Sequence, residues 1–325
     1  MDDFSNKQLN EEPEKNPDDS SNDEKYSPVN HIHPKISPVT AGIIGLLGGF
    51  FLYQIVGGLL TLLVFGFDYQ HAPVNSVRLM TMASQVLFIL LPALIFSKWV
   101  YEDVTTIIRF HLPKIEEILL FSLGIVVLTP LLQYYLSLQT YFIKILAANS
   151  SMVHSVKQLL DKLNDMVDKT YGNLLTAHSV LDGIIIILIV SVIPAICEET
   201  MFRGFIQRSF EFKFKSFWAA AITAMFFALY HFNPYGLIPL FGLGLYFGFA
   251  AYISDSIFVP VTLHFINNFA AVILYFIYGD DDIINSSVDK NFDLRSSVVI
   301  FIILSVVFAS VIYLIKKYYS KRKIV

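Results

Sequence analysis

The chain has 325 residues, of which 55% are hydrophobic and 15% are charged, with a mean hydropathy of +0.59. This balance excludes an ordinary water-exposed globular protein and places most of the chain in lipid. The net charge of -4 conceals an asymmetry, because acidic residues crowd the first 36 positions while basic residues cluster in the last ten. Such a split is a signal of membrane topology, and we expect no nucleic-acid partner. The sole cysteine, Cys197, excludes an intrachain disulfide.

The first 36 residues are rich in Asp, Glu, Asn, Ser and Pro and have almost no aliphatic side chains. Such a segment does not bury enough apolar surface to offset its ordering entropy. We therefore predict a disordered acidic tail over residues 1–36 and a transmembrane helical domain over residues 37–325. A cleaved signal peptide would begin with basic residues, so the first helix is expected to remain in the mature protein. His31 and His33 could bind a metal, but two histidines in a flexible tail are more often incidental.

Apolar runs long enough to cross a bilayer core, about 20 residues, recur along the rest of the chain. They predict an all-α polytopic membrane protein with about eight transmembrane helices. The fifth and sixth runs are short and are separated by Asn233 and Pro234. Glycines in the first run, and Gly242, Gly244 and Gly248 in the sixth, predict close helix packing. The predicted spans are residues 41–66, 79–100, 116–138, 182–202, 217–232, 236–254, 258–278 and 296–316.

Eight spans place both termini on one side of the membrane. The short loops on that side carry most of the basic residues, which predicts that both termini are cytoplasmic. These loop residues are Lys98, Arg109, Lys114, Arg208, Lys213 and Lys215. Residues 139–180 depart from the membrane pattern, because apolar residues recur at helical spacing among lysines and aspartates. They predict an amphipathic helix that lies on the far surface or covers the bundle there.

Ionisable residues inside spans are costly and usually functional. Glu198, Glu199 and Arg203 lie in the last turns of the fourth span, His231 ends the fifth, and His264 lies in the seventh. Two polar amides, Asn267 and Asn268, follow His264. Asp255 lies at a loop edge, where a solvated or capping role is the simpler interpretation. A single membrane histidine is often only hydrogen-bonded to a neighbouring helix, but the combination of these groups within about 70 residues predicts a site.

Helical geometry separates the two adjacent glutamates. Consecutive residues point about 100° apart, whereas residues four apart share a face. Glu199 and Arg203 therefore predict an ion pair that neutralises both charges. Glu198 has no such partner and is the carboxylate left for chemistry. His264 and Asn268 also share a face, and Asn267 is an alternative for the amide role.

Three motifs resemble those of the CAAX protease and bacteriocin-processing family of intramembrane proteases, which includes the Rce1-type prenyl-protein endopeptidases. EExxxR is matched by Glu198, Glu199 and Arg203. FxxxH is matched by Phe227 and His231, and HxxxN by His264 and Asn268. Each motif alone is weak, but together and in this order they are specific. The resemblance covers residues 182–278.

The resemblance implies an eight-helix membrane fold, an active site that opens toward the cytoplasm, and hydrolysis of a peptide bond near the C-terminus of a substrate. In the eukaryotic branch that substrate is a prenylated CAAX protein, so the implied partners are a peptide or lipidated protein and the bilayer. Single-chain prokaryotic members are common, and we expect a bacterial plasma membrane. Phe227 lies one turn before His231 and is expected to hold the imidazole by packing.

The chain has no HExxH or GxSxG motif, and Cys197 has no evident base, so water is the expected nucleophile. Glu198, aided by His231, is predicted to act as general base. His264 and Asn268 are predicted to donate hydrogen bonds to the oxyanion. The alternative is a zinc site formed by Glu198, His231 and His264. We favour the metal-free version because an amide at position 268 suits an oxyanion donor better than a zinc ligand.

Two other functions compete with proteolysis. A proton-coupled transporter would use Glu198 and the histidines as a relay. Against it stand the lack of a detectable internal repeat and the position of the acids at one helix end. A non-catalytic immunity or scaffold protein would bind partners through its membrane surface, and intact catalytic residues show capacity rather than use.

Overall fold

The structure is a computed structural model that describes residues 32–66, 72–278 and 292–322. The predicted tail falls almost entirely outside this range, as does His31. The described residues form helices and no strand, which confirms the all-α membrane fold. Among them, seven helical segments are long and apolar enough to span a membrane. The remaining predicted span, residues 217–232, corresponds to α11 (Ser216–Tyr230), which is apolar but has only 15 residues. The seven are Pro38–Phe65, Val74–Tyr101, Ile115–Asn149, Val180–Glu211, Leu237–Ser254, Phe258–Tyr278 and Leu294–Lys321.

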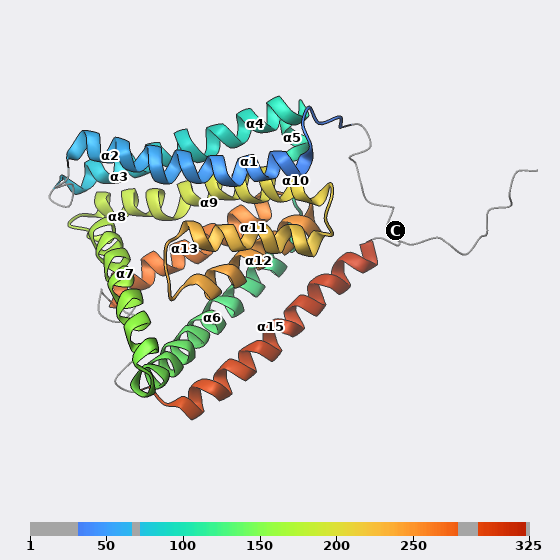
Figure 1. The fold of residues 1–325 in the computed structure, drawn as a ribbon. Coiled ribbons are helices and arrows are strands. Elements are labelled where there is room, and N and C mark those ends of the chain that lie inside the picture. Colours follow the sequence, from blue (N-terminus) through green and yellow to red (C-terminus); the bar gives the residue numbers. More distant parts are fainter. Residues whose placement is uncertain (1–31, 67–71, 279–291, 323–325) are drawn as a thin grey trace, which may run out of the picture. The chain divides into compact units, whose positions relative to one another are not determined.

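Three of the spanning segments are α-helices interrupted by π-helical turns, and Figure 1 shows them as long rods. The first rod is α1 (Pro38–Phe50), the π turn Phe51–Gly57 and α2 (Gly58–Phe65). The second is α3 (Val74–Gln85), the π turn Val86–Leu90 and α4 (Leu91–Tyr101). The third is α8 (Val180–Ile187), the π turn Leu188–Val192, α9 (Ile193–Glu199), the π turn Thr200–Ile206 and α10 (Gln207–Glu211).

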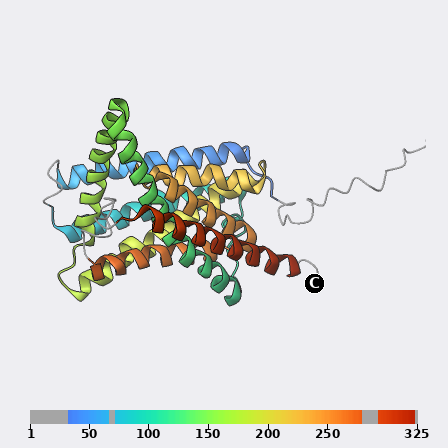
Figure 2. The same ribbon diagram turned by 90° about the horizontal axis from the view of Figure 1, so that it is seen from below.

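The other helices are uninterrupted. They are α5 (Val104–Ile107), α6 (Ile115–Asn149), α7 (Ser151–Leu175), α11 (Ser216–Tyr230), α12 (Leu237–Ser254), α13 (Phe258–Tyr278) and α15 (Leu294–Arg322). α11 packs on α12, α13 packs on the third rod and on α6, and α15 packs on α6. In Figure 2 the red α15 and the lower part of the green α6 lie away from the blue first rod. The core is therefore centred on the third rod, α11, α12 and α13.

The amphipathic helix predicted within residues 139–180 is α7, but its predicted start is wrong. Residues 139–149 continue the spanning helix α6. α6 ends because Ser150 is extended (φ -145°, ψ 121°), and its hydroxyl then accepts a hydrogen bond from Val153 N to cap α7. α7 runs across the ends of the rods, as Figure 1 shows at the left. Its last residue, Leu175, packs with Ile186 of α8 and Val272 of α13.

Hydrogen bonds tie distant segments together at each end of the bundle. At one end Lys35 N donates to Val100 O at 2.9 Å and Tyr319 Oη donates to Glu117 Oε1 at 2.7 Å. The start of α1 and the end of α15 thus lie at the end that carries α5, which we call the α5 end (Figure 1). At the other, the α7 end, Arg78 Nε of α3 donates to Leu174 O of α7 at 3.0 Å.

Close packing at glycines is confirmed where α12 crosses its neighbours. A Cβ at Gly244 would lie 3.0 Å from Ala224 Cβ, and one at Gly248 would lie 3.0 Å from Ala220 Cβ. Gly242 faces α6, where a Cβ would lie 3.3 Å from Leu132 Cδ2. The small residues let α11 and α12 approach closely.

Gly244→Ala should therefore destabilise the fold by about 1–3 kcal/mol, because the new methyl group meets backbone and Cβ atoms of α11 that do not move freely. Gly48→Ala is the matched control, since a Cβ there meets nothing within 4 Å. Thermal unfolding of both variants in detergent checks this. Equal unfolding temperatures would contradict the tight contact between α11 and α12.

Candidate active site

The centre of the site is a buried carboxylate with two partners. Glu199 Oε1 accepts a hydrogen bond from Arg203 Nη1 at 2.9 Å, which confirms the predicted ion pair. The same oxygen lies 2.8 Å from Nδ1 of His264 in α13. Glu199 and Arg203 are fully buried and His264 is nearly so. Arg203 also donates from Nη2 to Gly244 O of α12 at 3.0 Å. One carboxylate thus joins the third rod to α13, and its arginine reaches α12.

Aromatic rings enclose this cluster. The Arg203 guanidinium lies 4.5 Å from the ring centroid of Phe227, a cation–π contact. The Phe227 ring also packs on both histidines, with centroid distances of 4.7 Å to His231 and 5.9 Å to His264. Phe247 of α12 stacks on His264 at 5.4 Å and 22°. Phe227 therefore packs against His231 as predicted, and it contacts Arg203 and His264 as well.

His231 follows the last residue of α11, and its ring is held by the helix that precedes it. Its Nδ1 lies 2.7 Å from Phe227 O. A carbonyl oxygen only accepts hydrogen bonds, so Nδ1 carries a proton and Nε2 holds the lone pair in the neutral ring. His231 lines the cavity described below. It therefore offers a proton acceptor at Nε2.

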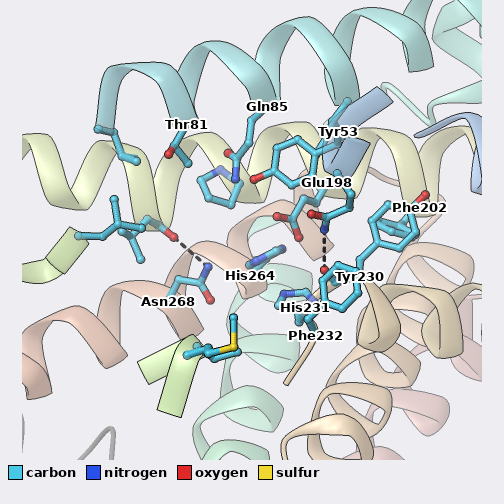
Figure 3. Close-up of a pocket in the computed structure, with 18 residues that line it drawn as sticks. Tyr53, Thr81, Gln85, Glu198, Phe202, Tyr230, His231, Phe232, His264 and Asn268 are labelled. Atoms are coloured by element: carbon cyan, nitrogen blue, oxygen red, sulfur yellow. Dashed lines mark hydrogen bonds between the residues drawn. The ribbon is translucent and has the colours of Figure 1, made fainter. Parts of the chain in front are cut away.

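Glu198 is turned away from this cluster. It forms no ion pair with a described residue, and its Oε2 is buried without a hydrogen-bond partner among the described residues. Its side chain lines the cavity with His231 and His264, as Figure 3 shows. A buried carboxylate oxygen without a donor is costly in the resting protein and is typical of a group that binds a ligand or water.

Asn268 is positioned by a proline on another helix. Pro194 has no N–H and leaves the carbonyl of Val190, four residues earlier, without its helical donor. Asn268 Nδ2 donates to that carbonyl at 2.9 Å (Figure 3). Its Oδ1 accepts from Asn267 Nδ2 at 3.2 Å. One N–H of Asn268 is used in this way, and the second is left for a ligand. Asn267 is further held by Thr129 Oγ1 at 3.1 Å and takes a supporting position.

A cavity of about 480 Å³ connects these groups. Its deep wall carries the motif residues Glu198, His231, His264 and Asn268, and its outer walls come from the first two rods and α7. Each of the π turns of the described chain contributes to or adjoins this lining. Such turns are frequent at functional sites. The lining also includes Tyr53, Gln54, Thr81, Gln85, Met166, Val167 and Leu174.

The family match agrees with this geometry. Residues 180–270 match the family described as type II CAAX prenyl endopeptidase Rce1-like. This segment belongs to the Rce1-like family. No curated protein and no solved structure matches the chain. All three motifs lie within the Rce1-like segment, and the family implies protease activity in general, with a peptide or protein as substrate.

The zinc alternative does not fit the side chains as they are arranged. In the described residues no group of three or more His, Cys, Asp or Glu side chains has the geometry to hold a metal ion. No step is therefore assigned to a metal, and metal dependence is a matter for experiment.

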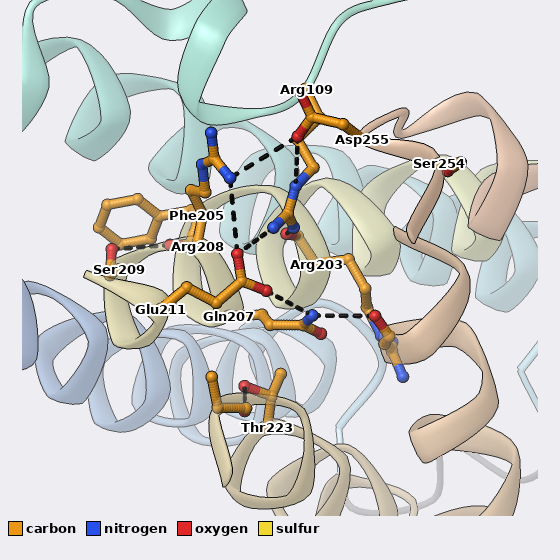
Figure 4. Close-up of polar contacts among 12 residues, drawn as sticks. Arg109, Arg203, Phe205, Gln207, Arg208, Ser209, Glu211, Thr223, Ser254 and Asp255 are labelled. Atoms are coloured by element: carbon orange, nitrogen blue, oxygen red, sulfur yellow. Dashed lines mark hydrogen bonds and ion pairs between the residues drawn. The ribbon is translucent and has the colours of Figure 1, made fainter. Parts of the chain in front are cut away.

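The motifs did not indicate a second buried polar cluster at the α5 end, drawn in Figure 4. Arg109 is fully buried, donates to Arg203 O at 2.9 Å and to Asp255 Oδ1 at 3.2 Å, and pairs with Glu211. Arg208 lies 3.6 Å from the same two acids. From the sequence, both arginines are predicted to be loop residues and Asp255 to be a solvated or capping residue. The positive φ of Arg109 (56°) and Asp255 (47°) is the local feature of this joint, but only the fold shows their pairing.

The rim formed by α7 carries an acid with a raised pKa, Asp168. Burial, together with the charge of Asp165, raises the pKa of Asp168 to about 6, against the effect of a hydrogen bond from Asn164 Nδ2 at 2.7 Å. Asp168 follows the lining residue Val167. This part of the rim therefore gains negative charge as pH rises through about 6.

The two glutamates should respond differently to substitution. Glu199→Gln and Arg203→Met each leave a charge of the buried pair uncompensated, at a cost of about 3–5 kcal/mol. Both variants should lose folded protein, whereas Glu198→Gln should fold normally because Glu198 forms no ion pair with a described residue, and Arg203 keeps its pair with Glu199. Thermal unfolding in detergent measures this. A normal unfolding temperature for Glu199→Gln would show that the pair is not structural.

Phe227 should support the site without taking part in the chemistry. Phe227→Leu keeps the backbone carbonyl that holds His231, so measurable activity should remain. His231→Ala removes the Nε2 acceptor and should abolish activity. The comparison is made on peptidase rates at equal amounts of folded protein, and equal losses would count against this division of roles.

Proposed function

We propose that the protein is an intramembrane endopeptidase that hydrolyses peptide bonds of membrane-associated polypeptides with water as the nucleophile. The Rce1-like match supports protease activity in general. The observation that carries the proposal further is the buried, unpartnered oxygen of Glu198 on the wall of a cavity that it shares with His231. A carboxylate and an imidazole that line one cavity can each accept a proton, so together they are suited to activating water.

In the proposed reaction Glu198 removes a proton from water as the water oxygen bonds to the carbonyl carbon of the substrate. His231 assists at Nε2, the nitrogen left with a lone pair while Nδ1 donates to Phe227 O. The carbonyl oxygen becomes an oxyanion. When this intermediate collapses, the C–N bond breaks and the proton held by Glu198 passes to the leaving amine. Water is the only co-reactant.

Asn268 and His264 are the proposed donors to the oxyanion. Asn268 has one amide N–H left after its bond to Val190 O. His264 uses Nδ1 toward Glu199, so it donates from Nε2 only when both ring nitrogens are protonated. A single such donor contributes about 2.7–4 kcal/mol to transition-state stabilisation. Asn268 is thus the donor that needs no change of protonation.

The substrate is proposed to be a peptide or a lipidated protein, with a prenylated CAAX-like chain as the class suggested by the family description. The protein is a multi-pass membrane protein, and a bacterial plasma membrane is its proposed location. The zinc-dependent protease, the non-catalytic scaffold and the transporter are the alternatives that experiment separates.

Purified protein should cleave members of a mixed pool of fluorogenic peptides in detergent, and Glu198→Ala should abolish cleavage because it removes the general base. Glu116→Ala, an exposed acid at the start of α6, is the matched control and should leave the rate unchanged. Equal rates for the wild type and Glu198→Ala across the pool would refute the proposed function.

Activity should also survive exhaustive chelation, with elemental analysis confirming metal-free protein. Loss of activity that stoichiometric zinc restores would overturn the glutamate-and-water mechanism in favour of the zinc site of Glu198, His231 and His264. Retained activity in metal-free protein would exclude that zinc site.

A further inference from the structure

The cavity extends from the middle of the bundle toward the α7 end. Thr81 lies seven residues after Val74, where α3 begins at the α7 end, so it lies roughly 10 Å into the bundle at 1.5 Å per residue. Glu198 lies eighteen residues after Val180, where α8 begins, which places it roughly 27 Å from that end. Met166, Val167 and Leu174 of α7 complete the lining. The motif residues are therefore at the bottom of the cavity and α7 is at its rim.

The bundle is closed on the other side of the motif residues. Arg203, Gln207 and Phe247 are fully buried, and none of them lines the cavity. Gln207 Nε2 donates to Glu211 Oε1 at 2.8 Å and to Gly248 O at 3.0 Å, and Glu211 continues into the arginine cluster of Figure 4. This packed layer separates the site from the α5 end. Access to Glu198 from the α5 end is therefore blocked.

The lysines and arginines are distributed unequally between the two ends. The short connections at the α5 end are basic even without the buried Arg109 and Arg208, since Lys98, Lys114, Lys213, Lys215 and the cluster at the end of α15 remain. α13 ends and α15 begins at the α7 end, and the sequence between them contributes one lysine, Lys290. α7 contributes Lys157, Lys162 and Lys169. The positive-inside rule places the α5 end in the cytoplasm.

Two expectations from the sequence therefore exclude each other in this fold. Cytoplasmic termini put the start of α1 and the end of α15 on the cytoplasmic face. The cavity then opens on the opposite face, whereas the family resemblance implies a cytoplasmic opening. The charge asymmetry belongs to this chain, and the match at residues 180–270 does not include α7 or the first two rods, which form the outer walls of the cavity.

We infer that the cavity takes its substrate from the non-cytoplasmic face of the membrane, through a mouth bordered by α7. The nature of the substrate rests on the proposed function: it is a polypeptide segment exposed on that face and lying near the membrane surface. α7 presents an apolar stripe outward at helical spacing, formed by the exposed Met152, Val156, Leu159, Leu163 and Met166. Such a stripe is suited to the bilayer interface and keeps the mouth at its level.

Labelling of single cysteines with a membrane-impermeant maleimide tests the inference in intact expressing cells and in permeabilised ones. All variants carry Cys197→Ala. Ser155→Cys marks the exposed surface of α7, Ser320→Cys marks the exposed end of α15, and Thr81→Cys reports on the cavity itself. Ser155→Cys and Thr81→Cys should be labelled in intact cells, and Ser320→Cys only after permeabilisation.

The opposite pattern would overturn the inference, as would labelling of Thr81→Cys only from the side of Ser320 or from neither side. Each variant is repeated with Glu198→Gln, which should label in the same way because labelling does not depend on catalysis. The expected labelling in a protein without peptidase activity would refute the proposed function and leave the orientation of the cavity standing. Peptidase activity together with the opposite labelling would support the proposed function and refute the inferred orientation of the cavity.

Discussion

The fold around the site depends on one buried carboxylate. Glu199 lies where an uncompensated charge is strongly unfavourable, and its Oε1 contacts Arg203 of the same rod at 2.9 Å and His264 of α13 at 2.8 Å. Arg203 extends the connection to the carbonyl of Gly244 in α12, which α11 approaches closely because position 244 has no side chain. Four helical segments are held in register by a charge that none of them accommodates alone.

The same constraint assigns the chemistry. Because Glu199 is held by two partners, the adjacent Glu198, about 100° around the helix, is left facing the cavity. Both histidines have Nδ1 fixed by an acceptor, Phe227 O for His231 and Glu199 for His264, so each directs its other nitrogen away from that partner. A preorganised site of this kind needs little reorganisation when charge develops on a substrate. Pro194 has no N–H to donate to Val190 O, so this carbonyl accepts a hydrogen bond from Asn268 and orients its side chain.

Local contacts could be predicted from the sequence and long-range ones could not. The Glu199–Arg203 pair and the packing of Phe227 on His231 follow from a spacing of four residues on a helix, and the apolar spans follow from length and hydropathy. The stacking of Phe247 on His264 follows from no spacing, because the two residues come from different helices. Arg109 looks like any loop arginine, and its burial depends on acids more than 100 residues away. The extension of α6 to Asn149 was missed because Lys144 interrupts the apolar run.

The cavity is lined by residues inside the family match and by residues outside it, so the match describes only part of the cavity. The bottom of the cavity, with Glu198, His231, His264 and Asn268, comes from the Rce1-like segment of residues 180–270. The rest of the lining includes residues of elements outside it, with Tyr53 from the first rod, Thr81 from α3 and Met166 from α7. Groups that contact the scissile bond determine the reaction, whereas groups at the mouth determine which chains reach it. Reaction type can therefore be shared with the family while the substrate differs, because the first two rods and α7 lie outside the matched residues.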